Sequence, residues 1–421
     1  MSLRISPRQI AWEIIYRVEF ESAYSNIILP KELKVSKLDE RDRAFVTELV
    51  YGSLRMRGYC DAAIAHFSDR PISEIDFKVL ITLRLGVYQI LILRMPIHAA
   101  VNETVELGKT VNGKAAATFI NALLRRVSEN LEFRPEAESD LFSHPQWIIN
   151  AFRDSLKNEN DVRAQLEADN EVAPPTLVAW PGRSTGEELL AAGAQKLEGG
   201  ENAYSFNGNP GDVAAVRERR AGVQDLGSQI VVEKFFESGS RDMRWLDLCA
   251  GPGGKAAYLD SLISEGELVV NEPAPERVKL LGQVVKRAKV LSFDGRLPPE
   301  DLGTFDRILI DAPCTGIGAL RRRPEVRWRR TPKDLRGLMQ LQSELLDSAA
   351  KLLNPDGIIG YATCSPHLGE TKLQISDFLK RHPEFERASV GEIGDKDGDL
   401  QLWTFRDGTD AMFLSLLKKP S

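Results

Sequence analysis

Two cysteines follow short apolar runs directly, at positions where a thiol could do covalent chemistry. Cys314 lies in Asp-Ala-Pro-Cys-Thr-Gly (311–316), and Cys364 lies in Ala-Thr-Cys-Ser-Pro (362–366). The runs before them, 307–310 and 357–361, predict buried strands. Parallel strands present their carboxyl ends at one edge of a sheet, where ligands bind. Both thiols are therefore expected at one site.

Two thiols at one site are compatible with two chemistries. A redox pair is one, although such pairs usually occupy a short CxxC turn. The other is methylation of a pyrimidine, in which a thiolate adds to C6 and makes C5 nucleophilic toward an electrophilic methyl group. Cations lower the pKa of a thiol from about 8.5, and Lys255 and the basic stretch 321–336 are candidates. Asp311 is placed to hydrogen-bond the N3/N4 edge of a cytosine.

A glycine-rich turn lies upstream of these cysteines. The predicted strand 244–248 runs into Ala250-Gly-Pro-Gly-Gly254, and a helix opens at Lys255. Glycines allow a ligand to approach the backbone closely. A second predicted strand ends before Glu272, whose carboxylate suits a ribose diol. Asp294, in a turn after a short strand, is a third candidate contact. The alternative is a structural turn without a ligand.

The composition limits the classes of protein to which the chain can belong. The chain has 421 residues, of which 43% are hydrophobic and 28% charged, as expected for two or three globular domains. No apolar stretch reaches the roughly 18 residues of a membrane span, and no secretory signal is recognisable. Four cysteines fit a reducing cytoplasm, and neither CxxC nor HxxxH occurs, so no metal site is expected.

One basic stretch stands out in a chain whose net charge is −6. Residues 321–336 contain eight basic and two acidic side chains, with Trp328 among them. A local field of this kind steers polyanions, and a cytosine presents C5 and C6 to a thiol only when it is unpaired or flipped out. The candidate RNA contacts are Arg321, Arg322, Arg323, Arg327 and Trp328. The alternative is a solvated basic surface.

The periodicity predicts three domains. Residues 1–135 show helical spacing at 10–18, 44–54, 79–93 and 116–127, which predicts an all-α domain. Residues 136–240 predict a small α+β connecting domain with a helix at 145–156, a strand at 174–180, a helix at 185–192 and a loop at 199–211. Residues 241–421 alternate strand and helix, which predicts a Rossmann-like α/β domain with a mostly parallel sheet.

The motifs together resemble those of the RsmB/Sun group, bacterial RNA cytosine-C5 methyltransferases. The resemblance is carried by Leu246-Asp-Leu-Cys-Ala-Gly-Pro-Gly-Gly-Lys255, Asp311-Ala-Pro-Cys-Thr-Gly316, Arg322-Arg-Pro-Glu-Val-Arg-Trp328 and Tyr361-Ala-Thr-Cys-Ser365. In the first 135 residues, Glu40-Arg-Asp-Arg-Ala44, Glu48-Leu-Val-Tyr-Gly52, His98-Ala-Ala-Val-Asn-Glu103 and Ile120-Asn-Ala-Leu-Leu-Arg-Arg126 resemble a NusB-like RNA-binding domain.

The resemblance implies a role for each matching residue. Cys364 is then the nucleophile that adds to C6, Cys314 assists release of the methylated RNA, and Asp311 and Lys255 are polar active-site residues. The implied contacts to S-adenosylmethionine are Cys249, Ala250, Gly251, Pro252, Gly253, Gly254, Lys255, Glu272, Asp294 and Asp311. Two positions depart from the family pattern, because Glu272 stands where aspartate is commoner and Gly251 replaces a frequent alanine.

The expected function is methylation of a cytosine in 16S ribosomal RNA by a cytoplasmic monomer that uses S-adenosylmethionine and neither metal nor membrane. Two alternatives stay open. The same chemistry could act on 23S ribosomal RNA or tRNA, since no residue excludes it. A non-catalytic RNA-binding factor of the antitermination type would instead have dispensable thiols and no cofactor pocket.

Overall fold

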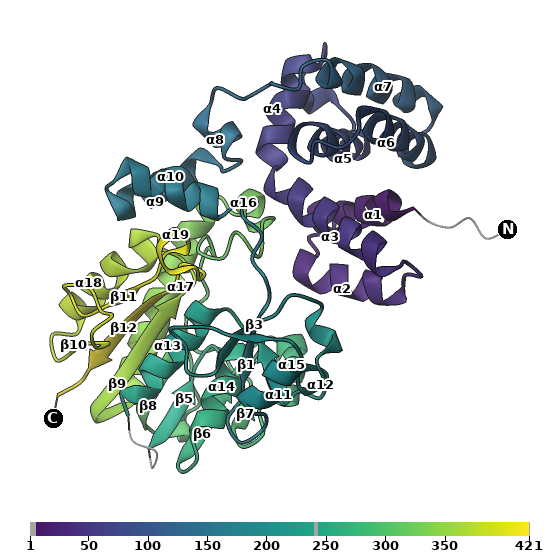
Figure 1. Cartoon of the computed structure of the whole chain (residues 1–421). Coiled ribbons are helices and arrows are strands. Elements are labelled where there is room, and N and C mark those ends of the chain that lie inside the picture. Colours follow the sequence, from purple (N-terminus) through teal and green to yellow (C-terminus); the bar gives the residue numbers. More distant parts are fainter. Residues whose placement is uncertain (1–5, 240–242, 421) are drawn as a thin grey trace. The chain divides into compact units, whose positions relative to one another are not determined.

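The structure is a computed structural model that describes residues 6–239 and 243–420. The chain forms two compact units (Figure 1). Unit 1 comprises Met1–Asn150, Leu166–Glu171 and Leu320–Arg329, and unit 2 comprises Ala151–Gln165, Val172–Ala319 and Arg330–Ser421. The domain boundary predicted between residues 240 and 241 lies outside the described residues.

The described part of unit 1 is helical, as its apolar spacing predicts. Its main helices are α1 (Pro7–Phe20), α2 (Ser25–Val35), α3 (Glu40–Arg55), α4 (Arg57–Phe67), α5 (Phe77–Val87), α6 (Ile97–Asn112) and α7 (Lys114–Ser128), followed by the short α8 (Glu138–Leu141). The side chain of Ser6 accepts a hydrogen bond from the Gln9 amide and caps α1. The predicted helix over 79–93 differs in one respect, because its second half, Tyr88–Ile92, is a π-helix.

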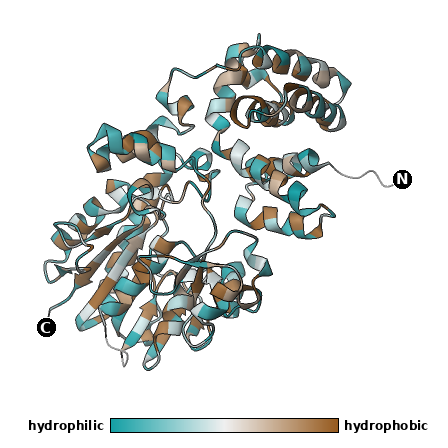
Figure 2. Cartoon of the chain, viewed as in Figure 1, coloured by the Kyte–Doolittle hydropathy of each residue, from teal (hydrophilic) through white to brown (hydrophobic). Residues whose placement is uncertain are grey.

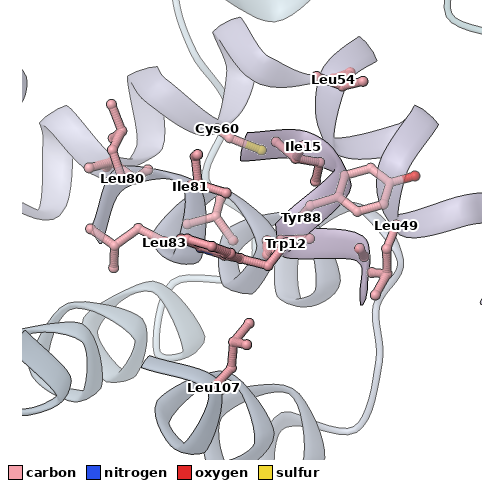
Figure 3. Close-up of a cluster of buried hydrophobic side chains, with 14 of the residues drawn as sticks. Trp12, Ile15, Leu49, Leu54, Cys60, Leu80, Ile81, Leu83, Tyr88 and Leu107 are labelled. Carbon is pink, nitrogen blue, oxygen red and sulfur yellow. The ribbon is translucent and has the colours of Figure 1, made fainter. Parts of the chain in front are cut away.

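One apolar core holds these helices together. Figure 3 shows part of it, with Trp12 of α1 and Leu107 of α6 among the labelled side chains. The indole nitrogen of Trp12 donates a hydrogen bond of 3.1 Å to the hydroxyl of Thr82, so its polar atom is satisfied inside the core. The helices carry both hydrophilic and hydrophobic residues (Figure 2), as amphipathic helices do.

A small antiparallel sheet lies in unit 2. Its strands are β1 (Thr176–Ala179), β2 (Gln195–Lys196), β3 (Ala203–Ser205) and β4 (Ala221–Val223), in the order β2-β3-β1-β4. The predicted strand over 174–180 corresponds to β1, and the predicted helices correspond to α9 (Gln146–Leu156) and α11 (Gly186–Ala191). The loop predicted over 199–211 is wrong in part. It contains β3, whose short sequence becomes a strand because it pairs with β1 on one side and β2 on the other.

The large sheet of unit 2 is mixed: the strands between residues 244 and 363 pair in parallel, as predicted, whereas the strand at 413–418 pairs antiparallel with its three neighbours. Its strands are β5 (Arg244–Asp247), β6 (Glu267–Asn271), β7 (Lys289–Leu291), β8 (Phe305–Asp311), β9 (Leu353–Thr363), β10 (Glu386–Ala388), β11 (Leu400–Gln401) and β12 (Phe413–Lys418). Their order is β10-β12-β9-β8-β5-β6-β7, with β11 beside β12. The chain proceeds from β5 to β6 and β7 on one side, then to β8 and β9 on the other, so β5 and β8 flank the switch point at which such sheets bind ligands.

Helices cover both faces of this sheet (Figure 1). One apolar core joins it to α13 (Leu226–Glu237), α14 (Gly254–Leu262) and α15 (Pro275–Val284), and the other joins it to α17 (Pro332–Leu352) and α18 (Lys372–Arg381). Successive strand residues alternate between the two cores: Trp245 packs in the first and Leu246 in the second. The central residues of β5 and β8 are therefore apolar on both faces, and Asp247 and Asp311 stand at their carboxyl ends.

Candidate active site

The two cysteines meet at the carboxyl ends of adjacent strands. β8 and β9 pair in parallel, with Asp311 opposite Ala362. Cys314 and Cys364 follow in the turns after these strands, and their Sγ atoms lie 3.4 Å apart. Both side chains are only partly buried. The strand register therefore brings together two thiols that are 50 residues apart in the chain.

Backbone hydrogen bonds hold the two turns together. The amide of Ala312 donates to the carbonyl of Ala362 at 2.8 Å, and the amide of Gly318 donates to the carbonyl of Cys364 at 2.9 Å. The first bond continues the ladder one residue beyond β8. The second connects the segment after Cys314 to the backbone of the other cysteine. The separation of the two thiols is thus set by main-chain geometry.

Lys255 and Asp311 form an ion pair beside the thiols. The Lys255 Nζ lies 2.9 Å from Oδ2 of Asp311, and the lysine side chain is largely buried at the start of α14. Burial by itself lowers the pKa of Lys255, but the Asp311 carboxylate outweighs it and the pKa is raised. The lysine is therefore a fixed cation, and the charge of Cys364 contributes to holding it in that form.

The glycine turn occupies the space between the ends of β5 and β6. Gly253 has φ +119°, a left-handed conformation that other residues rarely adopt. Glu272, directly after β6, is buried, and its Oε1 accepts a hydrogen bond of 2.9 Å from the Ala274 amide. Its carboxylate approaches Gly251 so closely that a Cβ there would lie 1.9 Å from Oε2. The turn and the acid form one packed unit.

Asp247 is a candidate site residue that the motif analysis did not select. It is fully buried at the end of β5, its Oδ1 accepts a hydrogen bond from the Cys249 amide, and its Oδ2 has no partner among the described residues. Burial, helped by the charge of Asp311, raises the pKa of Asp247 to about 8. In the sequence, Asp247 could have been selected because it is an acid in a predicted strand that leads into the glycine turn.

Cys249 and Asp294 follow other strands than the thiol pair does: Cys249 comes after β5 and Asp294 after β7. Cys249 lies next to Asp247, and burial first, then the Asp247 charge, raises the pKa of its thiol. Asp294 lies in the turn after β7, at the end of the sheet order, and Arg296 binds its half-exposed carboxylate at 2.6 Å. The structure therefore brings Cys314, Cys364, Asp311 and Lys255 together, while Asp294 follows a different strand, β7.

The predicted RNA contacts need a correction at Arg327. Segment Leu320–Arg329 belongs to unit 1, and the Arg327 side chain is completely buried there. Its guanidinium donates to the carbonyls of Arg55, Ser143 and Asp169 and to Oδ1 of Asn170, at 2.7–3.2 Å. A side chain so enclosed does not reach RNA. The positive charge that suggested a polyanion contact satisfies carbonyl groups of the protein instead.

Other residues of the same segment also pack within unit 1. Arg57 stacks on the half-buried ring of Trp328 at 5.1 Å, and buried Glu325 accepts hydrogen bonds from the amide and hydroxyl of Ser25. Arg323, by contrast, is exposed, while Arg321 and Arg322 are partly buried. The basic stretch is thus divided between packing residues and exposed cations.

The described residues contain no group of three or more His, Cys, Asp or Glu side chains arranged to hold a metal ion. Nor does any helix in this part of the chain combine the length and the apolar character needed to cross a membrane.

Comparisons with known proteins match almost the whole chain. Residues 237–418 match the family model described as 16S rRNA methyltransferase RsmB/F, and residues 5–129 match the NusB family. A putative methyltransferase of Mycobacterium tuberculosis (strain ATCC 25618 / H37Rv) is 41% identical, over 98% of this chain and 96% of that protein. The ribosomal RNA small subunit methyltransferase B of Enterobacter sp. (strain 638) is 32% identical, over 96% of each chain.

Solved structures share the fold. The crystal structure of the protein PH0851 superposes with a TM-score of 0.84, at 24% identity and over 100% of both chains. That of NSun6 from Pyrococcus horikoshii with SFG superposes with a TM-score of 0.58, at 16% identity, over 66% of this chain and 98% of that chain. At these identities the likeness concerns the fold.

Proposed function

Because the chain belongs to the 16S rRNA methyltransferase RsmB/F family, we propose that it methylates C5 of a cytosine in 16S ribosomal RNA. The family is S-adenosylmethionine-dependent. The observation that carries the proposal is the Sγ–Sγ distance of 3.4 Å between Cys314 and Cys364, beside the Lys255–Asp311 pair. A binding protein without catalysis has no need of two such thiols at a ligand-binding edge.

The residues around the glycine turn suit S-adenosylmethionine. Oδ2 of Asp247 is buried and has no partner among the described residues, which fits a polar group of a ligand. The buried carboxylate of Glu272 fits a ribose diol, and the backbone from Cys249 to Gly254 lies between these two acids. When bound, S-adenosylmethionine supplies a methyl group made electrophilic by the adjacent sulfonium.

We assign the nucleophile to Cys364. Its thiolate forms a bond to C6 of the cytosine, and the electron pair of the C5–C6 double bond becomes available at C5, which takes the methyl group. A base then removes the C5 proton, the double bond re-forms, and the C6–S bond breaks to return the thiolate. Cys314, at 3.4 Å, is placed to assist this last stage.

Lys255 and Asp311 contribute electrostatics to the same sequence. The fixed cation at Lys255 favours the thiolate of Cys364, because a nearby positive charge stabilises the charged form of a thiol. In this proposal Asp311, at the end of β8, binds the N3/N4 edge of the base while charge moves into the ring. The partly buried ion pair keeps both groups in fixed positions.

The test is methyl transfer to unmodified ribosomal RNA. Wild-type protein and Cys364→Ala are incubated with a labelled methyl donor, and the product is mapped by bisulfite sequencing. We expect one modified cytosine in 16S RNA with the wild type and none with Cys364→Ala. Full turnover by Cys364→Ala would contradict the assigned nucleophile. A modified cytosine in 23S RNA or tRNA instead would support the proposed chemistry but identify a different RNA as the substrate.

A further inference from the structure

Glu370 is a buried carboxylate beneath the two cysteine turns. It ends the short 3-10 helix Leu368–Glu370, and its exposed fraction is 0%. Its Oε1 accepts hydrogen bonds from the amide of Thr315 at 2.8 Å and from the side-chain amide of Gln342 at 3.1 Å, and its Oε2 accepts the hydroxyl of Thr315 at 2.5 Å. Three donors thus converge on one carboxylate inside the protein.

These bonds reach both residues that flank Cys314. The side-chain amide of Gln342 also donates to the carbonyl of Pro313 at 2.9 Å, while Thr315 is bound directly by Glu370. The turn that carries Cys314 is therefore held on each side of the cysteine. A change at position 370 acts on both attachments, because Gln342 and Thr315 share the same carboxylate oxygen.

The same network extends to the second cysteine. The hydroxyls of Thr315 and Ser365 lie 3.1 Å apart, and Ser365 directly follows Cys364. Because the single hydroxyl proton of Thr315 goes to Glu370, Ser365 is the donor in this contact. Glu370 therefore fixes the direction of a hydrogen-bond chain from one cysteine turn to the other.

The charge of Glu370 also acts on Cys314. The contact with Cys364, then burial, then the charges of Cys364, Glu370 and Asp311 all raise the pKa of the Cys314 thiol. Tyr361 faces the same groups and donates its hydroxyl proton to the backbone carbonyl of Glu370 at 2.9 Å. A glutamine at this position would keep one acceptor oxygen but present an N–H group to the Thr315 hydroxyl, so it would alter this network as well as remove the charge.

We propose that Glu370 is a positioning residue that aligns the two thiols and differentiates them. It holds the Cys314 turn against the Cys364 turn, and its charge adds to the Cys364 contact and to burial in favouring a neutral Cys314, while Cys364, beside Lys255, serves as the thiolate. The proposal rests on the proposed function, because the two thiols need different protonation states only if one attacks and the other assists release.

The first experiment needs neither RNA nor cofactor. In a Cys364→Ser background, the rate of Cys314 alkylation by iodoacetamide is measured against pH with peptide-resolved mass spectrometry. We compare Glu370 with Glu370→Gln, which keeps a hydrogen-bonding side chain and removes the charge. The matched control is Glu237→Gln, at an exposed position at the end of α13. We expect the midpoint of the curve of Cys314 alkylation rate against pH to fall by about half a pH unit or more in Glu370→Gln, and not in the control. An unchanged midpoint overturns the electrostatic role.

The second experiment measures turnover with both cysteines present. We expect Glu370→Gln to lower kcat by about tenfold or more and to leave KM for RNA within about twofold, because the thiols and not the RNA contacts are displaced. Equal kcat in Glu370→Gln and wild type overturns the positioning role. If Glu370→Gln does not fold, Glu370→Asp replaces it; this variant retains the charge with a shorter arm, and we expect the wild-type alkylation midpoint together with reduced kcat.

The two experiments separate this proposal from the proposed function. If the wild-type protein methylates no cytosine, the proposed function fails, and the alkylation midpoints still report on Glu370. If wild-type methylation is found while Glu370→Gln matches it in both measurements, only the role of Glu370 is contradicted.

Discussion

Gly251 and Glu272 fit each other: the Glu272 carboxylate occupies the place that a methyl group on residue 251 would take. A Cβ on residue 251 would lie 1.9 Å from Oε2 and 2.6 Å from Cδ of Glu272. From the sequence, these are the two positions at which we expect the chain to depart from the pattern of the family that it resembles. The absence of a side chain at residue 251 leaves room for the Glu272 carboxylate.

This fit predicts a coupled effect on cofactor binding. We expect Gly251→Ala to weaken S-adenosylmethionine binding about tenfold, because the Glu272 carboxylate must move. Adding Glu272→Asp should restore part of the loss, with a coupling energy of about 0.5–2 kcal/mol. Isothermal titration calorimetry of both single variants and the double variant measures this coupling. Strictly additive effects would show that the two positions are independent.

Cys314→Ala should stop the reaction after methyl transfer. If Cys314 assists release, the bond between Cys364 and C6 outlives the transfer, and a protein–RNA adduct that resists denaturant accumulates. Gel electrophoresis with labelled RNA detects it as a slowly migrating band. Cys60→Ala is the control, since Cys60 lies in the helical core of unit 1. Release of methylated RNA by Cys314→Ala at the wild-type rate would refute this role.

Asp247→Asn should stabilise the cofactor-free protein in a pH-dependent way. Burial raises the pKa of Asp247 to about 8, far above the value of about 3.9 for an unfolded chain. Between these values the unfolded chain releases a proton that the folded protein retains, so the contribution of Asp247 to stability falls as pH rises through this window. We expect thermal or urea unfolding to show little difference near pH 4 and stabilisation of about 1–3 kcal/mol at pH 8.

The same Asp247→Asn variant should bind S-adenosylmethionine more weakly, because an amide NH2 group replaces the buried Oδ2, which has no partner among the described residues. A gain in stability accompanied by a loss of binding would identify Asp247 as a ligand-binding residue that lowers the stability of the cofactor-free protein. A variant that is less stable at pH 8 would contradict the pKa assignment.

Arg327→Met should destabilise unit 1. The substitution leaves the carbonyls of Arg55, Ser143 and Asp169 without their buried donor. We expect a loss of about 3–5 kcal/mol of unfolding free energy, measured by denaturant titration. The control Arg323→Met, at an exposed position, should leave stability within about 0.5 kcal/mol. Reduced RNA affinity of Arg327→Met at unchanged stability would restore the original interpretation of Arg327 as an RNA contact.

Much of the fold follows from local patterns in the chain. The helices of unit 1 and the alternating elements of unit 2 were predictable because apolar periodicity depends on neighbours a few residues apart. The turns with Cys314 and Cys364 could be located for the same reason, since a polar turn after a buried strand marks a sheet edge. The strand β3 was missed because three residues carry little periodicity and its partner β1 lies more than twenty residues away.

Other features depend on contacts between distant segments. The 3.4 Å approach of the thiols follows from the register of β8 and β9, and the burial of Arg327 follows from its packing against segments 157–272 residues away. Glu370 and Asp247 look like ordinary acids in the sequence, because nothing local reveals what encloses a carboxylate. Residue types and local spacing therefore indicate which chemistry is available, whereas burial and partners, which set charge and reactivity, arise only when the chain packs against itself.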